Sequence, residues 1–362
     1  MKRIYAGMAA ALLAAILFIP LETEAVSADK AIVIDGTTQH VLFEKDADTQ
    51  ALIASTTKIM TALIVCEQCN VLDRVQIPKE AVGIEGSSMY LREGEVLTIQ
   101  ELLYGLMLQS GNDAATALAI YCGGTVEGFA ELMNDKARSL GLLNTHFVNP
   151  SGLDAPGHYS TARDMACLTA YAMQNAIFRQ TVSTKAVNVT GRRLTNHNKL
   201  LWRVEGANGV KTGYTKAAGR ILVSSAERNG RQLIAVTISA PDDWNDHKKL
   251  INDGFSQFAE VSLISKGDQL GLATVSGGSQ DSVSLIAAED CSLYIAPWEE
   301  PKLVIKESGI LYAPVVEGQS AGTAYICLDD VTVGRIPMIY GETVEATKEE
   351  KKSFWEKLFG SE

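Results

Sequence analysis

The chain has 362 residues, of which 46% are hydrophobic and 21% are charged, and its formal net charge is −11. This length and composition predict a globular protein with room for two domains of ordinary size. The acidic balance excludes wholesale binding of nucleic acid, because contacts to phosphate groups require a basic surface.

The N-terminal 28 residues have the pattern of a leader peptide. Two basic residues precede an apolar stretch from residue 8 to residue 19, which ends at Pro20. Ala25 and Ala28 provide two candidate cleavage sites. The alternative is an uncleaved membrane anchor, but the apolar stretch is short for a span. We therefore expect residues 1–28 to be a signal peptide outside the fold, and the mature protein to work outside the cytoplasm.

Residues 29–261 mix the patterns of strands and helices. Local signals mark where elements begin or end: a strand end at Gly36, capping boxes at Thr98-x-x-Glu101 and Thr161-x-x-Asp164, a hairpin turn at Asn229-Gly230 and a helix start at Asp242-Asp243. This order of elements predicts an α+β domain in which helices pack on an antiparallel sheet.

The six cysteines include one pair, Cys66 and Cys69, with C-x-x-C spacing. A zinc site would need a second cysteine or histidine pair, and none follows at a suitable distance. Both residues lie in an apolar helical pattern, so we expect them to be core thiols. A disulfide framework is not expected at this cysteine density, and the pairing of the six is left open.

The C-terminal quarter divides into two segments. In residues 262–345 short apolar segments alternate with Gly, Pro and Asp, which predicts a small all-β domain. Residues 346–362 predict a short amphipathic helix, in which Phe354 and Leu358, and likewise Trp355 and Phe359, lie one turn apart. This tail helix either lies on a membrane surface or packs on protein, and the sequence leaves both open.

The segment A-S-T-T-K-I-M places Ser55 three residues before Lys58, at the start of an apolar helix. A serine hydroxyl needs a base to act as a nucleophile, and a lysine can be that base only if its pKa is lowered. Burial and a helix N-terminus both have this effect. The alternative is a helix cap followed by an exposed lysine.

Two further polar segments interrupt apolar surroundings. S-G-N at 110–112 lies between two apolar helical segments, where it is either a functional turn or an ordinary loop. K-T-G at 211–213 lies in a predicted strand, and its glycine permits close approach of another backbone or a ligand. The alternative there is an edge strand that carries a protective lysine.

The three motifs, in this order and about 55 and about 100 residues apart, resemble those of the penicillin-recognising serine peptidases and β-lactamases. Within that group the chain resembles the low-molecular-mass penicillin-binding proteins of the serine peptidase S11 family, and among these it resembles the type represented by penicillin-binding proteins 5 and 6. Further similar stretches are 149–154, 158–166, 211–219 and 309–319. The resemblance implies a transpeptidase-like domain followed by a small all-β domain, and D-alanyl-D-alanine carboxypeptidase activity.

The resemblance implies a role for each residue of the first two motifs. Ser55 would attack the carbonyl between two terminal D-alanines, and Lys58 would accept its proton. Ser110 would relay a proton to the leaving amine. Asn112 would hold Lys58 and bind the substrate amide.

It implies substrate-binding roles for the third segment. Lys211 would supply positive charge near the terminal carboxylate, Thr212 and Thr215 would hydrogen-bond it, and Gly213 would permit close approach. The backbone N–H groups of Ser55 and Tyr214 would form the oxyanion hole. Tyr214 and Arg220 occupy positions where the family varies.

The implied partners are peptidoglycan stem peptides ending in D-Ala-D-Ala and β-lactam antibiotics, with no cofactor or metal. The expected location is the cell wall or the outer face of the cytoplasmic membrane. The two alternatives are a β-lactamase, for which we find no clear deacylating glutamate, and a penicillin-binding sensor without catalysis.

Overall fold

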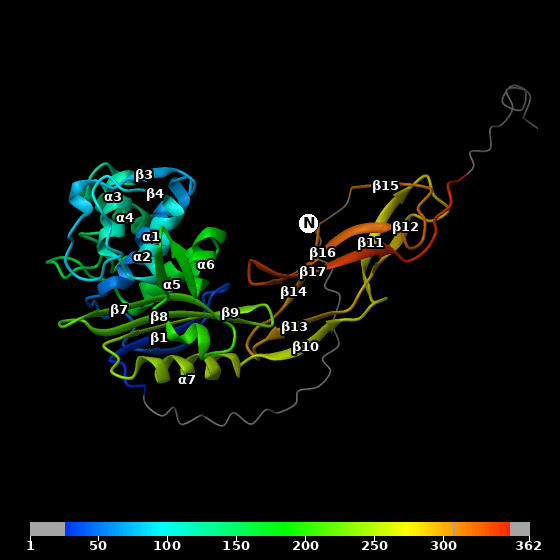
Figure 1. Cartoon of the computed structure of the whole chain (residues 1–362). Helices are drawn as coiled ribbons and strands as arrows, with labels where there is room; N and C mark the ends of the chain where they lie inside the picture. Colours follow the sequence, from blue (N-terminus) through cyan, green and yellow to red (C-terminus); the bar gives the residue numbers. More distant parts are fainter. Residues whose placement is uncertain (1–25, 307–308, 348–362) are drawn as a thin grey trace, which may run out of the picture.

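The computed structural model describes residues 26–306 and 309–347. Its N-terminal part is built on a five-stranded sheet in which every neighbouring pair is antiparallel (Figure 1). The strands run in the order β2 (Val41–Lys45), β1 (Lys30–Asp35), β9 (Arg231–Ile238), β8 (Gly219–Arg228) and β7 (Ala207–Thr215). The order places the first strand of the domain against its last, and leaves β7 at one edge of the sheet.

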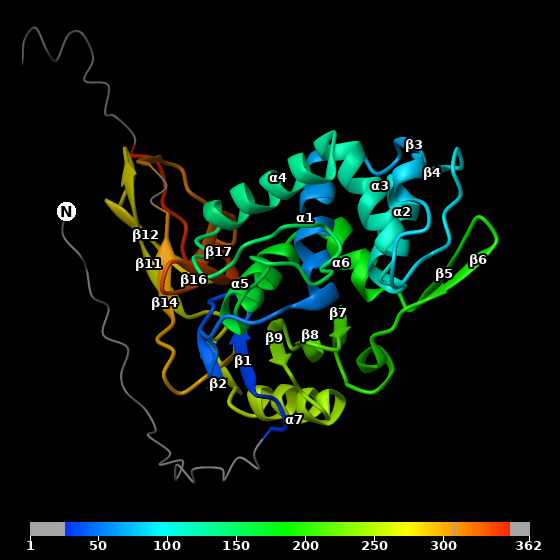
Figure 2. The same cartoon turned by 90° about the vertical axis from the view of Figure 1, so that its left-hand side faces the viewer.

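Helices cover both faces of this sheet (Figures 1 and 2). They are α1 (Lys58–Gln68), α2 (Ile99–Leu108), α3 (Asn112–Gly123), α4 (Val126–Ser139), α5 (Ala162–Ala172), α6 (Ala176–Ser183) and α7 (Asp243–Phe255). Side chains of β1 alternate between the two faces: Ile32 and Ile34 pack in the core below α1 and α5, whereas Val33 packs against α7. The expected α+β architecture is confirmed.

Several local predictions are confirmed. Thr98 and Glu101 form a reciprocal capping box at the start of α2. Asn229 and Gly230 both have positive φ, 50° and 75°, in the turn between β8 and β9. Thr161 caps α5 through the Asp164 N–H, although the Asp164 carboxylate bonds to residues 144 and 145 rather than back to the cap.

Residues 26–28 belong to the fold, in contrast to the expectation that the first 28 residues lie outside it. Ala28 is fully buried, and Val26 is 7% exposed. The Asp246 carboxylate of α7 accepts hydrogen bonds from the Ser27 N–H at 2.9 Å and the Ser27 hydroxyl at 2.7 Å. The rest of the predicted signal peptide, residues 1–25, lies outside the described residues.

The C-terminal part is all β, as expected. A six-stranded sheet has the order β14 (Lys302–Ile305), β16 (Ser320–Leu328), β17 (Val331–Tyr340), β12 (Ser282–Ala287), β11 (Gln269–Ser276) and β15 (Leu311–Tyr312). A separate pair joins β10 (Ala259–Ile264) to β13 (Cys291–Ile295), so the boundary expected at residue 262 falls inside β10. Of the predicted tail helix, residues 348–362 lie outside the described residues.

One arginine ties the two parts together. Arg231 of β9 donates to the Asp35 carboxylate at 2.9 Å, to the Tyr294 carbonyl at 2.7 Å and to the Glu299 carboxylate. Its guanidinium also lies 4.7 Å from the centre of the Phe258 ring. The Arg231, Asp35 and Glu299 side chains are each less than 10% exposed, so this junction is a buried, paired charge network.

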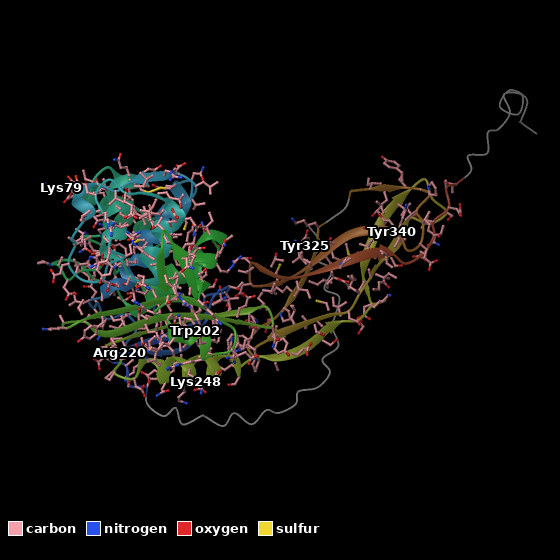
Figure 3. The ribbon with its side chains drawn as sticks, viewed as in Figure 1. Lys79, Trp202, Arg220, Lys248, Tyr325 and Tyr340 are labelled. Atoms are coloured by element: carbon pink, nitrogen blue, oxygen red, sulfur yellow. A yellow bond between two sulfur atoms is a disulfide. The ribbon has the colours of Figure 1, made fainter. Side chains whose placement is uncertain are left out.

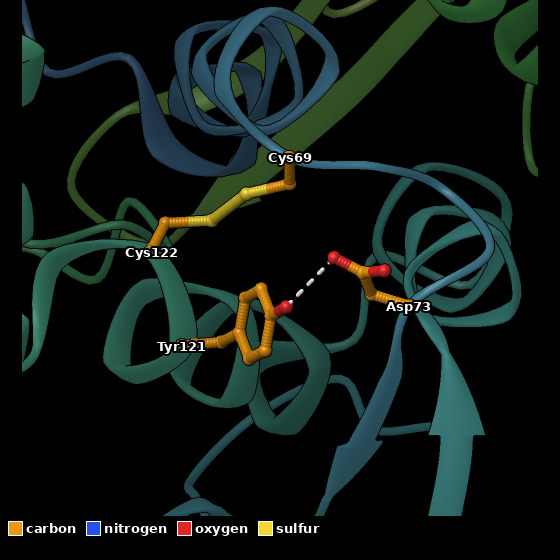
Figure 4. The surroundings of a disulfide bond; sticks show 4 residues. All are labelled: Cys69, Asp73, Tyr121 and Cys122. Atoms are coloured by element: carbon orange, nitrogen blue, oxygen red, sulfur yellow. Dashed lines mark hydrogen bonds between the residues drawn. A yellow bond between two sulfur atoms is a disulfide. The ribbon is translucent and has the colours of Figure 1, made fainter.

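A disulfide joins two helices of the N-terminal part. Cys69, the residue after α1, bonds to Cys122 of α3, beside the hydrogen bond from the Tyr121 hydroxyl to Asp73 (Figure 4). The expectation that both Cys66 and Cys69 are core thiols is therefore wrong for Cys69. Its backbone is extended, with φ −113° and ψ 146°, so its side chain leaves the face of α1 that buries Cys66.

We predict that the Cys122→Ser variant is less stable than the wild type. The bond closes a sequence separation of 53 residues, and loop-closure entropy gives about 4 kcal/mol for a loop of that size. Denaturant unfolding with and without reductant measures the difference. Cys122→Ser should unfold at the same midpoint in both conditions, whereas the control Cys167→Ala, which removes a free thiol and keeps the disulfide, should respond to reductant as the wild type does. An unfolding midpoint of the wild type that ignores reductant would contradict the prediction.

Candidate active site

Ser55 and Lys58 lie on one short helical segment. Residues Ala54–Thr57 form the 3-10 helix η1, which runs directly into α1 at Lys58. The Lys58 amine lies 3.1 Å from the Ser55 hydroxyl oxygen, and Lys58 is fully buried. The alternative of a surface lysine after a helix cap is therefore wrong.

The Lys58 amine has two further contacts, and both are to carbonyl oxygens. They are the side-chain oxygen of Asn112, at 2.7 Å, and the backbone oxygen of Ser151. A neutral amine has two N–H donors and one lone pair, so it can serve both carbonyls and still accept the Ser55 proton. Burial, and secondarily the charge of Lys211, hold the pKa of the Lys58 amine well below its usual range.

The S-G-N turn lies between α2 and α3 and is buried. Ser110 is 5% exposed and adopts a positive φ of 61°. Asn112 begins α3; its N–H donates to the Ser87 carbonyl at 2.7 Å, and its side-chain nitrogen donates to the Glu85 carbonyl at 2.6 Å. These bonds orient the Asn112 oxygen toward Lys58, so the tripeptide is more than an ordinary loop.

The K-T-G segment lies on β7, next to the nucleophile. Lys211 is 1% exposed and donates to the Thr212 carbonyl at 2.8 Å, so it is not a protective surface lysine. Burial lowers the pKa of Lys211 to about 7. A side chain at Gly213 would lie 3.3 Å from the backbone nitrogen of Ser55 and from the Ile53 carbonyl, so glycine lets β7 approach the η1 segment.

The predicted residues meet at one cleft of about 370 Å³. Ser55, Ser110, Thr212, Gly213 and Tyr214 line it. Lys58, Asn112 and Lys211 lie buried beside it. Thr215 has other partners: its hydroxyl accepts from the Ala218 N–H at 3.0 Å and donates to Asp154 at 3.2 Å. Of the remaining lining residues, Arg220 was named from the sequence without a defined role, and the others were not predicted: Ser87, His197, Lys199, Asp243 and Trp244.

The segment 149–152 supports the nucleophile from behind, and sequence reasoning gave it no role. The Asn149 side chain accepts from the N–H groups of Ser151 and Gly152, which forms a tight turn. Gly152 has φ 83°, and a side chain there would meet the Ala54 carbonyl. The N-P-S-G sequence could have predicted this turn. It could not have predicted the contact with Lys58, because the Lys58 partner is a backbone oxygen, which every residue has.

Arg220 is an exposed cation that lines the cleft. It lies on the side of the sheet that faces away from the β domain (Figure 3). Its guanidinium donates to the Asp243 carboxylate at 2.7 Å and lies 5.9 Å from the centre of the Trp244 ring. The Asp243 side chain is 4% exposed, so it fixes the guanidinium while other donors of Arg220 remain available.

Family models match both parts of the chain. Residues 19–242 match the Peptidase_S11 family, described as D-alanyl-D-alanine carboxypeptidase. The chain belongs to this family. Residues 258–346 match the C-terminal domain of penicillin-binding protein 5.

Individual proteins agree with this assignment. The chain is 33% identical to the D-alanyl-D-alanine carboxypeptidase DacF of Bacillus subtilis, over 88% of this chain and 86% of that protein. It is 35% identical to the D-alanyl-D-alanine carboxypeptidase DacC of Escherichia coli, over 90% of this chain and 86% of that protein. The crystal structure of penicillin-binding protein 5 from Haemophilus influenzae superposes on this structure with a TM-score of 0.64 and is 30% identical in sequence. The match covers 89% of this chain and 98% of that chain.

Membership of the family makes the protein a serine peptidase with D-alanyl-D-alanine carboxypeptidase activity in peptidoglycan metabolism. The fold, a transpeptidase-like domain followed by a β domain, agrees with that assignment. The β-lactamase and sensor alternatives are not favoured by these matches.

We predict that Lys211→Met moves the acid limb of the acylation rate to higher pH. The Lys211 charge lowers the pKa of Lys58, so its removal raises that pKa and leaves less neutral amine at a given pH. A shift on the order of one pH unit is expected. The measurement is the pH profile of the rate of acylation by penicillin.

Lys199→Met is the matched control for this variant. Lys199 lines the same cleft but is exposed, so solvent screens its charge and the profile should move less. A Lys211→Met profile that stays in place, or moves to lower pH, would show that Lys211 does not set the pKa of the base.

Proposed function

We propose that the protein removes the terminal D-alanine from stem peptides ending in D-Ala-D-Ala through an acyl-enzyme on Ser55. The observation that carries the proposal is the buried Lys58 amine, 3.1 Å from the Ser55 hydroxyl and otherwise bonded to carbonyl oxygens. A serine so placed has its own base, which is what nucleophilic catalysis requires.

In the acylation step, the Ser55 oxygen attacks the carbonyl carbon between the two D-alanines while Lys58 takes the hydroxyl proton. The backbone N–H groups of Ser55 and Tyr214 stabilise the developing oxyanion. The Ser110 hydroxyl passes a proton to the leaving nitrogen, the C–N bond breaks and D-alanine departs. The buried position of Ser110 beside the cleft supports this relay.

In the deacylation step, water attacks the acyl carbon and the ester bond to Ser55 breaks. A proton returns to the Ser55 oxygen, which restores the free enzyme. Lys58 is suited to activate this water because it is the base nearest to the ester oxygen.

The terminal carboxylate binds at the end of the cleft formed by Thr212, Lys211 and Arg220. Lys211 is buried and has a pKa of about 7, so it is only partly charged at neutral pH. Arg220 is permanently charged, lines the same cleft and presents a planar set of donors suited to a carboxylate. Thr215 contributes indirectly, since its hydroxyl is bonded to Asp154 and to the turn at Ala218.

The decisive experiment is mass spectrometry after incubation with penicillin, which would enter as a substrate mimic. We expect one adduct, mapped to Ser55, and slow turnover. Ser55→Ala should form no adduct and release no D-alanine from a D-Ala-D-Ala peptide. Ser87→Ala, a serine of the same cleft without a lysine partner, should still form the adduct. An adduct on another residue, or unchanged D-alanine release by Ser55→Ala, would refute the proposal.

We predict that Arg220→Leu loses discrimination between a free C-terminal carboxylate and its amide. Removing a charge-assisted contact of about 1.4 kcal/mol lowers the ratio of the two kcat/KM values about tenfold. Kinetics on a D-Ala-D-Ala peptide and its C-terminal amide measure this ratio. Arg228→Leu, at the opposite end of β8, is the control. If Arg220→Leu leaves the ratio of the two kcat/KM values unchanged, Arg220 does not bind the terminal carboxylate.

The proposed location is outside the cytoplasm. A disulfide persists in an oxidising compartment, and the Cys69–Cys122 bond supports export. The packing of residues 26–28 favours signal cleavage after Ala25 over Ala28, because the later cut would remove Val26 and Ser27 from the fold. None of the helices within 26–306 and 309–347 is long and apolar enough to cross a bilayer.

The proposed domain division follows the sheets. The peptidase domain comprises residues 26–258, rather than 29–261, and the β domain begins with β10 and extends to at least residue 347, rather than 345, because Ala346 and Thr347 pair with residues 278 and 277. The amphipathic pattern of residues 346–362 supports contact with a membrane surface after the β domain.

A further inference from the structure

A buried histidine links the turn at residues 149–152 to the helical segment that carries the nucleophile. His158 is 2% exposed. Its Nδ1 atom lies 3.1 Å from the Val148 nitrogen, and its Nε2 atom lies 2.8 Å from the Thr57 hydroxyl oxygen. Val148 comes immediately before the turn, and Thr57 comes immediately before Lys58. One imidazole therefore bridges the turn and the start of α1.

The two hydrogen bonds of His158 define its tautomer. A backbone N–H can only donate, so the Nδ1 atom accepts from Val148. A neutral imidazole has one acceptor nitrogen and one donor nitrogen, so Nε2 carries the proton and donates to Thr57. Burial lowers the pKa of His158 to about 4, so the ring is neutral at neutral pH and keeps this donor.

Further contacts fix the His158 ring on the side of the turn. The ring packs edge-on against Phe147, with 5.8 Å between the ring centres. Phe147 is anchored to α4 by Asn134, whose side chain donates to the Phe147 carbonyl and accepts from the Phe147 N–H, both at 2.8 Å. The His158 N–H donates to the Ala155 carbonyl at 3.0 Å. The imidazole is thus held in one orientation, with its N–H directed at Thr57.

The turn meets the start of α1 at two further points. A side chain at Gly152 would lie 2.7 Å from the Thr57 hydroxyl oxygen, so the turn packs directly on Thr57. One helical turn further on, the Thr61 hydroxyl donates to the Pro150 carbonyl at 2.7 Å. The Ser151 carbonyl belongs to the same turn. Its position relative to the catalytic amine therefore depends on how the turn is seated on α1.

The Ser151 carbonyl helps to orient the Lys58 amine. A neutral amine has two N–H groups and one lone pair, and here the carbonyl oxygens of Ser151 and Asn112 engage both N–H groups. The lone pair is then left for the Ser55 hydroxyl, 3.1 Å away. Without the Ser151 acceptor the amine could turn an N–H toward Ser55, and in that orientation it could not take the proton.

We propose that His158 is a positioning residue: its hydrogen bond to Thr57 keeps the carbonyl acceptor of the turn against the Lys58 amine. This inference rests on the proposed function, in which Lys58 takes the proton of Ser55. His158 does not line the catalytic cleft, so it acts through the orientation of the base. It should therefore affect the rate constant of acylation rather than the binding of the acylating compound.

The test separates the two hydrogen bonds of the ring. In His158→Asn, the side-chain oxygen takes the place of Nδ1 and keeps the bond to Val148, but the bond to Thr57 is lost. In His158→Gln, the side-chain nitrogen takes the place of Nε2 and keeps the bond to Thr57. Both variants remove the ring, so both lose its packing. Thr57→Val removes the same hydrogen bond from the other side.

His247→Gln is the matched control. His247 is also fully buried, and its ring nitrogens lie 2.6 Å from the Ser224 hydroxyl and 2.9 Å from the Thr237 hydroxyl. It belongs to α7, which packs on the opposite face of the sheet from α1. Its replacement should lower the free energy of unfolding and leave the acylation rate constant of the folded enzyme unchanged.

The measurement is time-resolved mass spectrometry of the Ser55 adduct over a series of penicillin concentrations. It gives the acylation rate constant and the dissociation constant separately, for the fraction of protein that can be acylated. We expect His158→Asn and Thr57→Val to lose about tenfold in the rate constant. Their dissociation constants should stay within about twofold of the wild-type value. His158→Gln and the control should stay within about twofold in both constants.

An unchanged rate constant in either His158→Asn or Thr57→Val overturns the inference. An equal loss in His158→Asn and His158→Gln also overturns it, because ring packing rather than the Thr57 bond would then be responsible, and so does a loss confined to the dissociation constant. If His158→Asn does not fold, Thr57→Val still reports on the same bond. Failure of the proposed function has a different signature, a wild-type protein that forms no adduct on Ser55.

Discussion

The structure depends on one buried amine. Burying a charged ammonium costs free energy, and Lys58 is fully buried with no carboxylate among its hydrogen-bond partners in the described part of the chain. The fold resolves this by giving the amine two carbonyl acceptors and one hydroxyl, a set that suits the neutral form. Those acceptors come from η1, the start of α3 and the turn at residue 151. The neutral Lys58 amine, and with it the activation of Ser55, therefore depends on how these three segments pack together.

Close backbone approach makes this arrangement possible. Gly152 lies against the Ala54 carbonyl, and Gly213 lies against the Ser55 nitrogen, so the η1 turn is held from two sides where any side chain would intrude. Gly213 lines the cleft beside Ser55 and contributes main chain only. Rigid main-chain walls suit a reaction that depends on fixed N–H donors.

The order of motifs in the sequence predicts the family, the α+β architecture and the convergence of Ser55, Lys58, Asn112 and Lys211, because each motif is local and its context is strongly apolar. What the sequence could not reveal depends on backbone atoms or on tertiary distance. Every residue has a backbone carbonyl, so the sequence does not mark Ser151 as the partner of Lys58. The partner of Cys69 lies 53 residues away, and Arg220 meets Asp243 only because α7 packs on β8. The roles of the site residues and the tail helix remain predictions.

The Arg231 junction has a mechanical consequence. The Arg231 guanidinium bonds to Asp35 of the peptidase part and to Glu299 and the Tyr294 carbonyl of the β domain. A rotation of one part against the other would leave a buried carboxylate without its partner. The β domain, which extends away from the sheet in Figure 1, is therefore a stiff arm rather than a swinging tether. Such an arm keeps the catalytic cleft at a fixed distance from the far end of the β domain, and the length of the domain sets that distance.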